Sequence, residues 1–170
     1  MQPDTFVQIH KTHAEKHLSC LAQDGIEIRL IDNAYCLFVD GFNWMNTNSI
    51  DILDHKRILE FEGRVLCTGL GLGVCVAYAA LNPNIAHVDV IENDPRIISI
   101  IKPMLEKAFP EFSFRIIQAD ADTFDAHGYD CAFLDHYPAA IPDEIKQKYC
   151  TQIPEVVCWY DEALKWSKQC

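Results

Sequence analysis

A glycine-rich loop between a buried strand and an apolar helix constrains the fold of this chain more than any other feature. Residues 64–69, R-V-L-C-T-G, form an apolar run that is typical of a buried strand. The loop G-L-G-L-G occupies residues 69–73, and residues 73–81 are almost wholly apolar up to Asn82-Pro83. Glycines let a backbone approach a ligand closely, and the start of a helix presents free N–H groups. The stretch therefore predicts a strand, a ligand-binding loop and a helix in succession.

The apolar pattern continues as an alternation of strands and helices after this loop. A helix is expected to begin after Asp94, with Pro95 in its first turn, and Pro103 should kink it or end its regular part. A short helix is expected over 142–150. Further strands are expected over 87–92, 112–119, 129–135 and 155–161. This order predicts an α/β fold with a Rossmann-like, mostly parallel sheet, covered on both faces, over residues 63–170.

The first part of the chain, residues 1–62, predicts a small N-terminal helix plus β-hairpin extension with a connecting helix. Helical spacing of apolar residues and strand-like alternation follow one another here. The expected elements are a helix over 5–23, hairpin strands over 26–31 and 34–40, a loop or short strand over 40–48, and a helix that Asn48 or Ser49 caps and that runs to about Phe61. We therefore divide the chain into two units at residue 62.

Acidic side chains follow the ends of three predicted parallel strands. Glu92 ends the second strand, where a carboxylate can accept hydrogen bonds from both hydroxyls of a ribose. The third strand leads into Asp120, and the fourth leads into Asp135-His136-Tyr137. Because the carboxyl ends of parallel strands meet at one edge of a sheet, these side chains should share a site. The pattern predicts a nucleoside site at which Asp135 acts as a general base or orients the substrate.

The spacing of the glycine loop indicates which nucleoside cofactor binds. Val74 stands where dinucleotide-binding loops have their third glycine, and G-x-G-x-G instead resembles motif I of class I S-adenosylmethionine-dependent methyltransferases. In that family the loop lies against the methionine part of the cofactor, an acid binds the ribose, and an acid with the next residue faces the adenine. The resemblance thus implies S-adenosylmethionine as cofactor, with Gly69, Gly71, Gly73, Glu92, Asn93, Asp120 and Ala121 as binding residues. Asp122 is a rival for the place of Asp120.

The layout of the chain is also similar to the spermidine synthase family. A hairpin, an Asp-Gly pair at Asp40-Gly41, a capped helix and the glycine loop follow in that order, with Asn43 or Asn46 near an expected Gln. Asp135 matches the catalytic acid of that family, and Tyr137-Pro138 replaces its second acid. The segment D-H-Y-P also echoes a D-P-P-Y sequence of N-methyltransferases. The resemblance implies substrate-binding roles for Asp40, His136 and Tyr137.

These observations predict methyl transfer from S-adenosylmethionine to a small molecule, with Asp135 as the catalytic residue. Aminopropyl transfer of the spermidine synthase type is the first alternative. The second is a binding protein that keeps the nucleoside site and has lost catalysis.

Charge and hydrophobicity indicate which class of substrate and which cellular compartment to expect. The formal net charge is −11 and the basic residues are scattered singly, which favours a small-molecule substrate over nucleic acid. No apolar run reaches the roughly 18–20 residues of a membrane span. The chain begins without a signal-peptide pattern, so we expect a cytoplasmic protein with its eight cysteines reduced.

Histidines also cluster near the N-terminus, and they raise the question of a metal. His10, His13 and His17 have helical spacing, but no carboxylate or cysteine stands at ligand spacing, so we expect no metal there. His55 and His136 are the two histidines expected near the site.

The C-terminal end of the predicted sheet suggests an assembly. The chain ends soon after the fifth strand, which leaves no room for the sixth and seventh strands of a full class I methyltransferase sheet. An apolar edge strand should be covered, and a two-fold dimer is the commonest way to cover one. We therefore expect a homodimer through the C-terminal region, with Trp159 or Trp166 near the contact.

Overall fold

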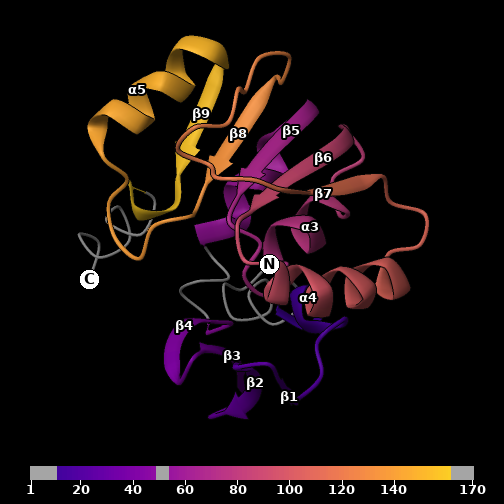
Figure 1. Cartoon of the computed structure of the whole chain (residues 1–170). Coiled ribbons are helices and arrows are strands. Elements are labelled where there is room, and N and C mark those ends of the chain that lie inside the picture. Colours follow the sequence, from indigo (N-terminus) through magenta and orange to yellow (C-terminus); the bar gives the residue numbers. More distant parts are fainter. Residues whose placement is uncertain (1–10, 49–53, 162–170) are drawn as a thin grey trace, which may run out of the picture.

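Two β-sheets organise the structure, a small antiparallel sheet from the N-terminal part and a larger parallel sheet flanked by helices (Figure 1). The computed structural model describes residues 11–48 and 54–161 of the 170-residue chain. The expected division at residue 62 falls between the two sheets and stays a prediction.

The larger sheet confirms the predicted parallel α/β architecture. Its strands follow the order β7-β6-β5-β8-β9, and every neighbouring pair is parallel. The strands are β5 (Gly63–Thr68), β6 (Ile85–Glu92), β7 (Phe114–Gln118), β8 (Cys131–Leu134) and β9 (Glu155–Cys158). The chain runs outward from β5 to β7 and then returns to β8 on the other side of β5. This reversal creates a crevice at the carboxyl ends of β5 and β8.

Helices cover both faces of this sheet, as the apolar runs in the strands require. Val65 and Cys67 of β5 pack in one core with α3 (Val74–Ala79), α4 (Pro95–Ala108) and the 3₁₀ helix η1 (His55–Glu60). Leu66 points to the opposite face and packs in a second core with α5 (Asp143–Gln152). Pro103 does not end α4, which continues to Ala108.

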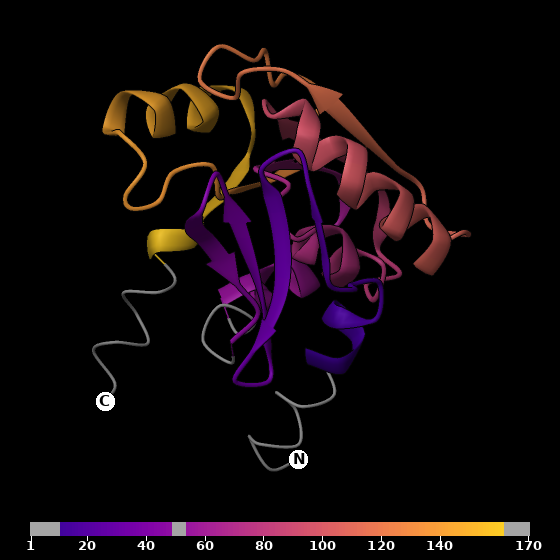
Figure 2. The same ribbon diagram turned by 60° about the horizontal axis from the view of Figure 1, so that its bottom comes forward.

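The small sheet consists of three consecutive hairpins. Its strands are β1 (Leu21–Gln23), β2 (Ile26–Ile31), β3 (Ala34–Val39) and β4 (Phe42–Asn46). Each connection has two residues at positive φ, as the type I′ turn of a tight hairpin requires: Asp24-Gly25, Asp32-Asn33 and Asp40-Gly41. Figure 2 brings this sheet to the front, beside α4. Its buried face, with Ile26, Ile28 and Leu37, belongs to the same core as α3 and α4.

Several predicted boundaries differ from the observed ones. The helix expected over 5–23 is wrong at its C-terminal end, because helical structure ends at residue 15 and Leu21–Gln23 pair with β2 as β1. The hairpin turn at Asp24-Gly25 dictates that pairing. The strand expected over 155–161 ends at Cys158, and 159–161 are helical. The loop or short strand expected over 40–48 is confirmed as a strand, β4. Ser49, His10 and Trp166 lie outside the described residues.

The structure also bears on membrane spans, thiols and metal ligands. In the described ranges no helix is long and apolar enough to cross a membrane. The seven cysteines in these ranges are free thiols. No group of three potential metal ligands is present in the part of the chain that the structure describes. His13 and His17 instead lie 3.0 Å and 2.6 Å from the carbonyl oxygens of Ala77 and Leu72.

Candidate functional site

A cleft of about 550 Å³ opens at the carboxyl ends of the parallel strands, where the fold predicts a ligand. The loops after β5, β6, β7 and β8 form its floor, and β4 of the small sheet forms one wall. Nine of the residues predicted for the cofactor, the acceptor or catalysis line the cleft: Gly69, Gly71, Glu92, Asn93, Asp120, Ala121, Asp135, His136 and Tyr137. Residues from four separate strand ends therefore meet in one cleft.

Two glycines of the loop line the cleft, both with positive φ, and each lies in a close contact. Gly69 has φ +83°, and a Cβ there would come within 2.0 Å of the backbone oxygen of Asp135. Gly71 has φ +47°, and a Cβ there would come within 2.2 Å of Met45 Sδ on β4. The first contact brings the ends of β5 and β8 together, and the second seats the small sheet on the loop. Gly73 lies outside the cleft, at the N-cap of α3.

Glu92 places a buried carboxylate beside this loop at the end of β6. Its Oε2 accepts a hydrogen bond from the backbone N–H of Leu70, and its Oε1 accepts one from that of Asp94, both at 2.9 Å. The side chain is thereby fixed in one orientation. A carboxylate has about four lone-pair sites, so each oxygen can accept one further donor. Glu92 can thus hold two hydroxyl groups of a ligand, and Asn93 lines the cleft next to it.

The loop after β7 separates the roles of its two acids. The carboxylate of Asp122 accepts hydrogen bonds from Tyr137 Oη at 2.6 Å and from His136 Nε2 at 3.2 Å. Asp120 is exposed, and its carboxylate accepts a hydrogen bond from the backbone N–H of Asp122. Ala121 is buried, and its carbonyl accepts a hydrogen bond from Tyr149 Oη. Both acids line the cleft: Asp120 keeps acceptor capacity to spare, whereas Asp122 ties its loop to the loop after β8.

Asp135 is anchored at the end of β8, between β5 and η1. Its N–H lies 3.0 Å from the carbonyl of Thr68 and 3.2 Å from the Thr68 hydroxyl. Its Oδ2 lies 3.6 Å from Nε2 of His55, whose side chain is 4% exposed. The His55 ring packs against Phe133, with centroids 5.0 Å apart. The arrangement holds a carboxylate at the cleft with a buried imidazole behind it.

His136 and Tyr137 are held by hydrogen bonds to Asp122, and each has a shifted pKa. Burial lowers the pKa of His136, so the imidazole is neutral at neutral pH and accepts at Nδ1 from the Thr68 hydroxyl, 2.6 Å away. The hydrogen bond to Asp122 raises the pKa of Tyr137 to about 12. Both side chains thus present neutral groups to the cleft.

Asp40 does not line the cleft. It occupies the β3–β4 turn, at φ +50°, and its carboxylate forms an ion pair with Arg96 of α4. The Asp-Gly pair is needed for the type I′ turn, and this position turns the side chain toward α4.

Other residues of the cleft wall were not predicted. Trp44 and Met45 come from β4, Cys75 from α3, and Trp159 from the turn after β9. Asn43 and Asn46, which stand near the Gln expected from the spermidine synthase layout, also line the cleft. The sequence signal that could have identified Trp44 is its position as a large aromatic residue in a polar segment. In the structure its side chain is 57% exposed.

Comparisons with known proteins place the fold. No family model matches the sequence, and no curated protein matches it. A putative RNA methyltransferase from Pyrococcus horikoshii superposes with a TM-score of 0.62 at 13% identity, over 91% of this chain and 73% of that one. A spermidine synthase in complex with the transition-state analogue AdoDATO gives 0.61 at 15% identity, over 86% and 62%.

The fold is class I methyltransferase-like. A third structure agrees, the Pyrococcus abyssi tRNA (uracil-54, C5)-methyltransferase in complex with S-adenosyl-L-homocysteine, with a TM-score of 0.54 at 13% identity, over 87% of this chain and 38% of that one. The chain also spans 51% of the Thermotoga maritima spermidine synthase. It therefore covers less than two thirds of the length of most of these methyltransferase-like structures.

Proposed function

We propose that this protein binds S-adenosylmethionine in the cleft and transfers its methyl group to a small molecule. The main support for this proposal is the buried carboxylate of Glu92, which two backbone N–H groups hold beside the glycine loop. In that loop Gly69 and Gly71 leave room for a ligand. A ribose needs such a pair of acceptor oxygens, and the methionine part needs a backbone that can be approached closely. The cleft volume lies in the range of small-molecule sites.

Each part of the cofactor has a group in this chain to hold it. Glu92 accepts the two ribose hydroxyls, the backbone at Gly69 and Gly71 contacts the methionine part, and Asp120 with Ala121 contacts the adenine. When bound, the cofactor would supply a methyl group on a positively charged sulfur. The nucleophile of the acceptor would bond to the methyl carbon in line as the carbon–sulfur bond breaks, with S-adenosylhomocysteine as the leaving group. Asp135 orients that nucleophile or accepts its proton, with His55 behind it.

The charge of the cleft supports a small acceptor rather than nucleic acid. Four lining residues are acids, namely Glu92, Asp120, Asp122 and Asp135, and no lysine or arginine is among the lining residues that the structure describes. A phosphate backbone would be repelled by such a lining, and its binding depends on basic side chains.

Titration calorimetry with Glu92 variants tests the cofactor. Glu92→Ala should weaken S-adenosylmethionine binding by about 1.5–3 kcal/mol, roughly 10- to 150-fold in Kd, because hydrogen bonds to a charged group are lost. Glu111→Ala changes an exposed acid outside the cleft and serves as the matched control. Unchanged affinity in a folded Glu92→Ala protein would remove Glu92 from the binding site. Tighter binding of NAD than of S-adenosylmethionine would remove the cofactor assignment itself.

Aminopropyl transfer is the second candidate, and two observations favour it. The acidic lining suits a cationic amine, and a spermidine synthase is among the structures with the same fold. Decarboxylated S-adenosylmethionine, in the same titration, distinguishes the two reactions. If it binds at least tenfold more tightly than S-adenosylmethionine, aminopropyl transfer replaces methyl transfer. Tight binding of either cofactor without turnover of any amine, hydroxyl or thiol acceptor favours a non-catalytic binding protein.

A further inference from the structure

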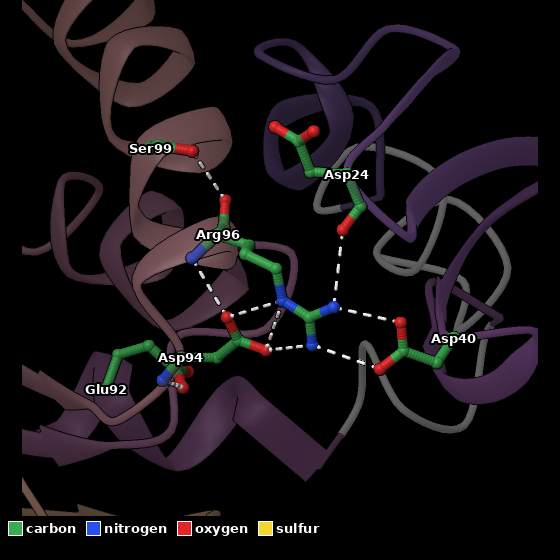
Figure 3. Close-up of polar contacts among 6 residues, drawn as sticks. All are labelled: Asp24, Asp40, Glu92, Asp94, Arg96 and Ser99. Atoms are coloured by element: carbon green, nitrogen blue, oxygen red, sulfur yellow. Dashed lines mark hydrogen bonds and ion pairs between the residues drawn. The ribbon is translucent and has the colours of Figure 1, made fainter.

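One arginine joins the small sheet to the cofactor side of the cleft. Arg96 lies in the first turn of α4, and Figure 3 shows its guanidinium between the carboxylates of Asp94 and Asp40. Nε and Nη2 donate to Asp94 at 2.7–3.2 Å, while Nη1 and Nη2 donate to Asp40 at 2.9 Å and 3.1 Å. Nη1 also donates to the carbonyl of Asp24 at 3.2 Å. All five guanidinium N–H groups therefore have acceptors.

The hydrogen bonds of Arg96 to Asp94 lead on to Glu92, which lines the cleft. Asp94 caps α4 by accepting the backbone N–H of Arg96, at 2.9 Å. The N–H of Asp94 in turn donates to Oε1 of Glu92, the carboxylate proposed to hold the ribose. The position of Arg96 therefore fixes Asp94, and Asp94 fixes Glu92.

On the other side, the contacts reach two hairpin turns of the small sheet. Asp40 lies in the β3–β4 turn, and its Oδ1 would be 2.3 Å from a Cβ on Gly25, in the β1–β2 turn. β4 begins two residues after Asp40 and carries Met45 to its contact with Gly71. The contacts of Arg96 thus hold the sheet whose last strand is a wall of the cleft.

We propose that Arg96 is a positioning residue that couples the placement of Glu92 to the placement of β4. The coupling means that a change at Asp40, outside the cleft, weakens ligand binding inside it. For the identity of the ligand, this inference rests on the proposed function.

The strength of the clamp comes from its geometry. The interaction of one arginine with two carboxylates, each bound through two N–H groups, is stronger than an isolated surface ion pair. The hydrogen bonds from Arg96 lower the pKa of Asp40 and of Asp94, so both carboxylates stay ionised at neutral pH. Loss of Arg96 would leave these two acids unneutralised near Glu92, which is buried.

The first test is calorimetric titration with S-adenosylmethionine. Asp40→Asn should weaken binding about 3- to 10-fold, the lower range of coupling between two sites. The matched control is Asp32→Asn, in the β2–β3 turn of the same sheet, which has nearly the same φ and forms no ion pair with any residue that the structure describes. It should stay within about twofold of wild type. The double variant with Arg96→Gln should bind no more weakly than Arg96→Gln alone, because both changes break one clamp.

The second test uses hydrogen exchange of the free protein, so that it does not depend on the cofactor. In Asp40→Asn, exchange should speed up at the Leu70 and Asp94 amides, which donate to Glu92, whereas Asp32→Asn should leave these amides at the wild-type rate. If the wild-type protein binds no S-adenosylmethionine, the proposed function is refuted. The exchange rates of these two amides still test the coupling in that case. Unchanged exchange at both amides, or effects of the two substitutions that simply add, would overturn the coupling. Thermal melting of each variant shows whether a general loss of stability explains the result.

Discussion

At the scale of single residues, Asp135 is the group whose chemistry can be isolated most cleanly. It lines the cleft at the end of β8, whereas the residues proposed to hold the ribose and the adenine follow β6 and β7. Asp135→Asn keeps the shape of the side chain and removes its ability to accept a proton. We expect cofactor affinity within about twofold of wild type and turnover reduced roughly 10²- to 10⁴-fold, the range of general base catalysis.

The measurement is single-turnover methyl transfer over a panel of amine, hydroxyl and thiol acceptors, with cofactor binding measured in parallel. Asp143→Asn, on the exposed first turn of α5, is the control. Turnover by Asp135→Asn at the wild-type rate would show that Asp135 does not act as a base.

His17 provides a second residue-scale prediction, through its contact with the glycine loop. A carbonyl only accepts hydrogen bonds, so Nε2 of His17 carries the proton that it donates to Leu72. Burial lowers the pKa of His17 to about 4. Between pH 6.5 and 4 the unfolded chain therefore binds a proton that the folded protein excludes, and the free energy of unfolding falls as the pH falls. The loss is on the order of 3 kcal/mol at most.

Urea denaturation over this pH range tests the assignment. His17→Gln keeps a donor for Leu72 without a titrating group, so its free energy of unfolding should change less between pH 6.5 and 4 than that of wild type. His127→Gln changes an exposed histidine and should retain the wild-type slope. Equal slopes in His17→Gln and wild type would assign the acid sensitivity to other groups.

At the scale of elements, the sequence predicted what local pattern determines and missed what packing determines. The parallel strands and the glycine loop were predictable because apolar runs, glycines and strand-end acids lie close together in the chain. β1 was not, since helical spacing over 5–23 competed with the Asp24-Gly25 turn, and the turn prevailed. The fifth strand was overextended, because a short apolar run does not distinguish strand from helix.

The same distinction explains the site. The floor could be predicted because Glu92, Asp120 and Asp135 each follow a strand directly. The wall could not, because Met45 meets Gly71 only after the small sheet has packed on the loop. Asp40 shows a different kind of error. The sequence assigns it to the substrate site, but it lies in a hairpin turn and its side chain forms an ion pair with Arg96.

At the scale of the whole molecule, the outer edge of β9 gives a reason to expect association. β9 pairs with β8 on one side, and within the described ranges no strand pairs with its other side. A groove runs along that side and is lined by Arg57, Lys146 and Val156 among others. An edge strand with unpaired N–H and C=O groups is a template for pairing, and a two-fold dimer is its commonest partner arrangement.

We therefore expect a homodimer in solution through this C-terminal edge, and light scattering across a dilution series at micromolar concentration measures it. The groove also holds the acids Glu155 and Asp161, and Lys146 forms an ion pair with Asp161 within one chain. Lys146→Glu should then shift dissociation to higher protein concentration, because it sets like charges against each other. Lys102→Glu makes the same change on α4, away from the groove, and should leave the transition in place. A particle of 19.4 kDa at every concentration would contradict the dimer and would require the β9 edge to be protected within one chain.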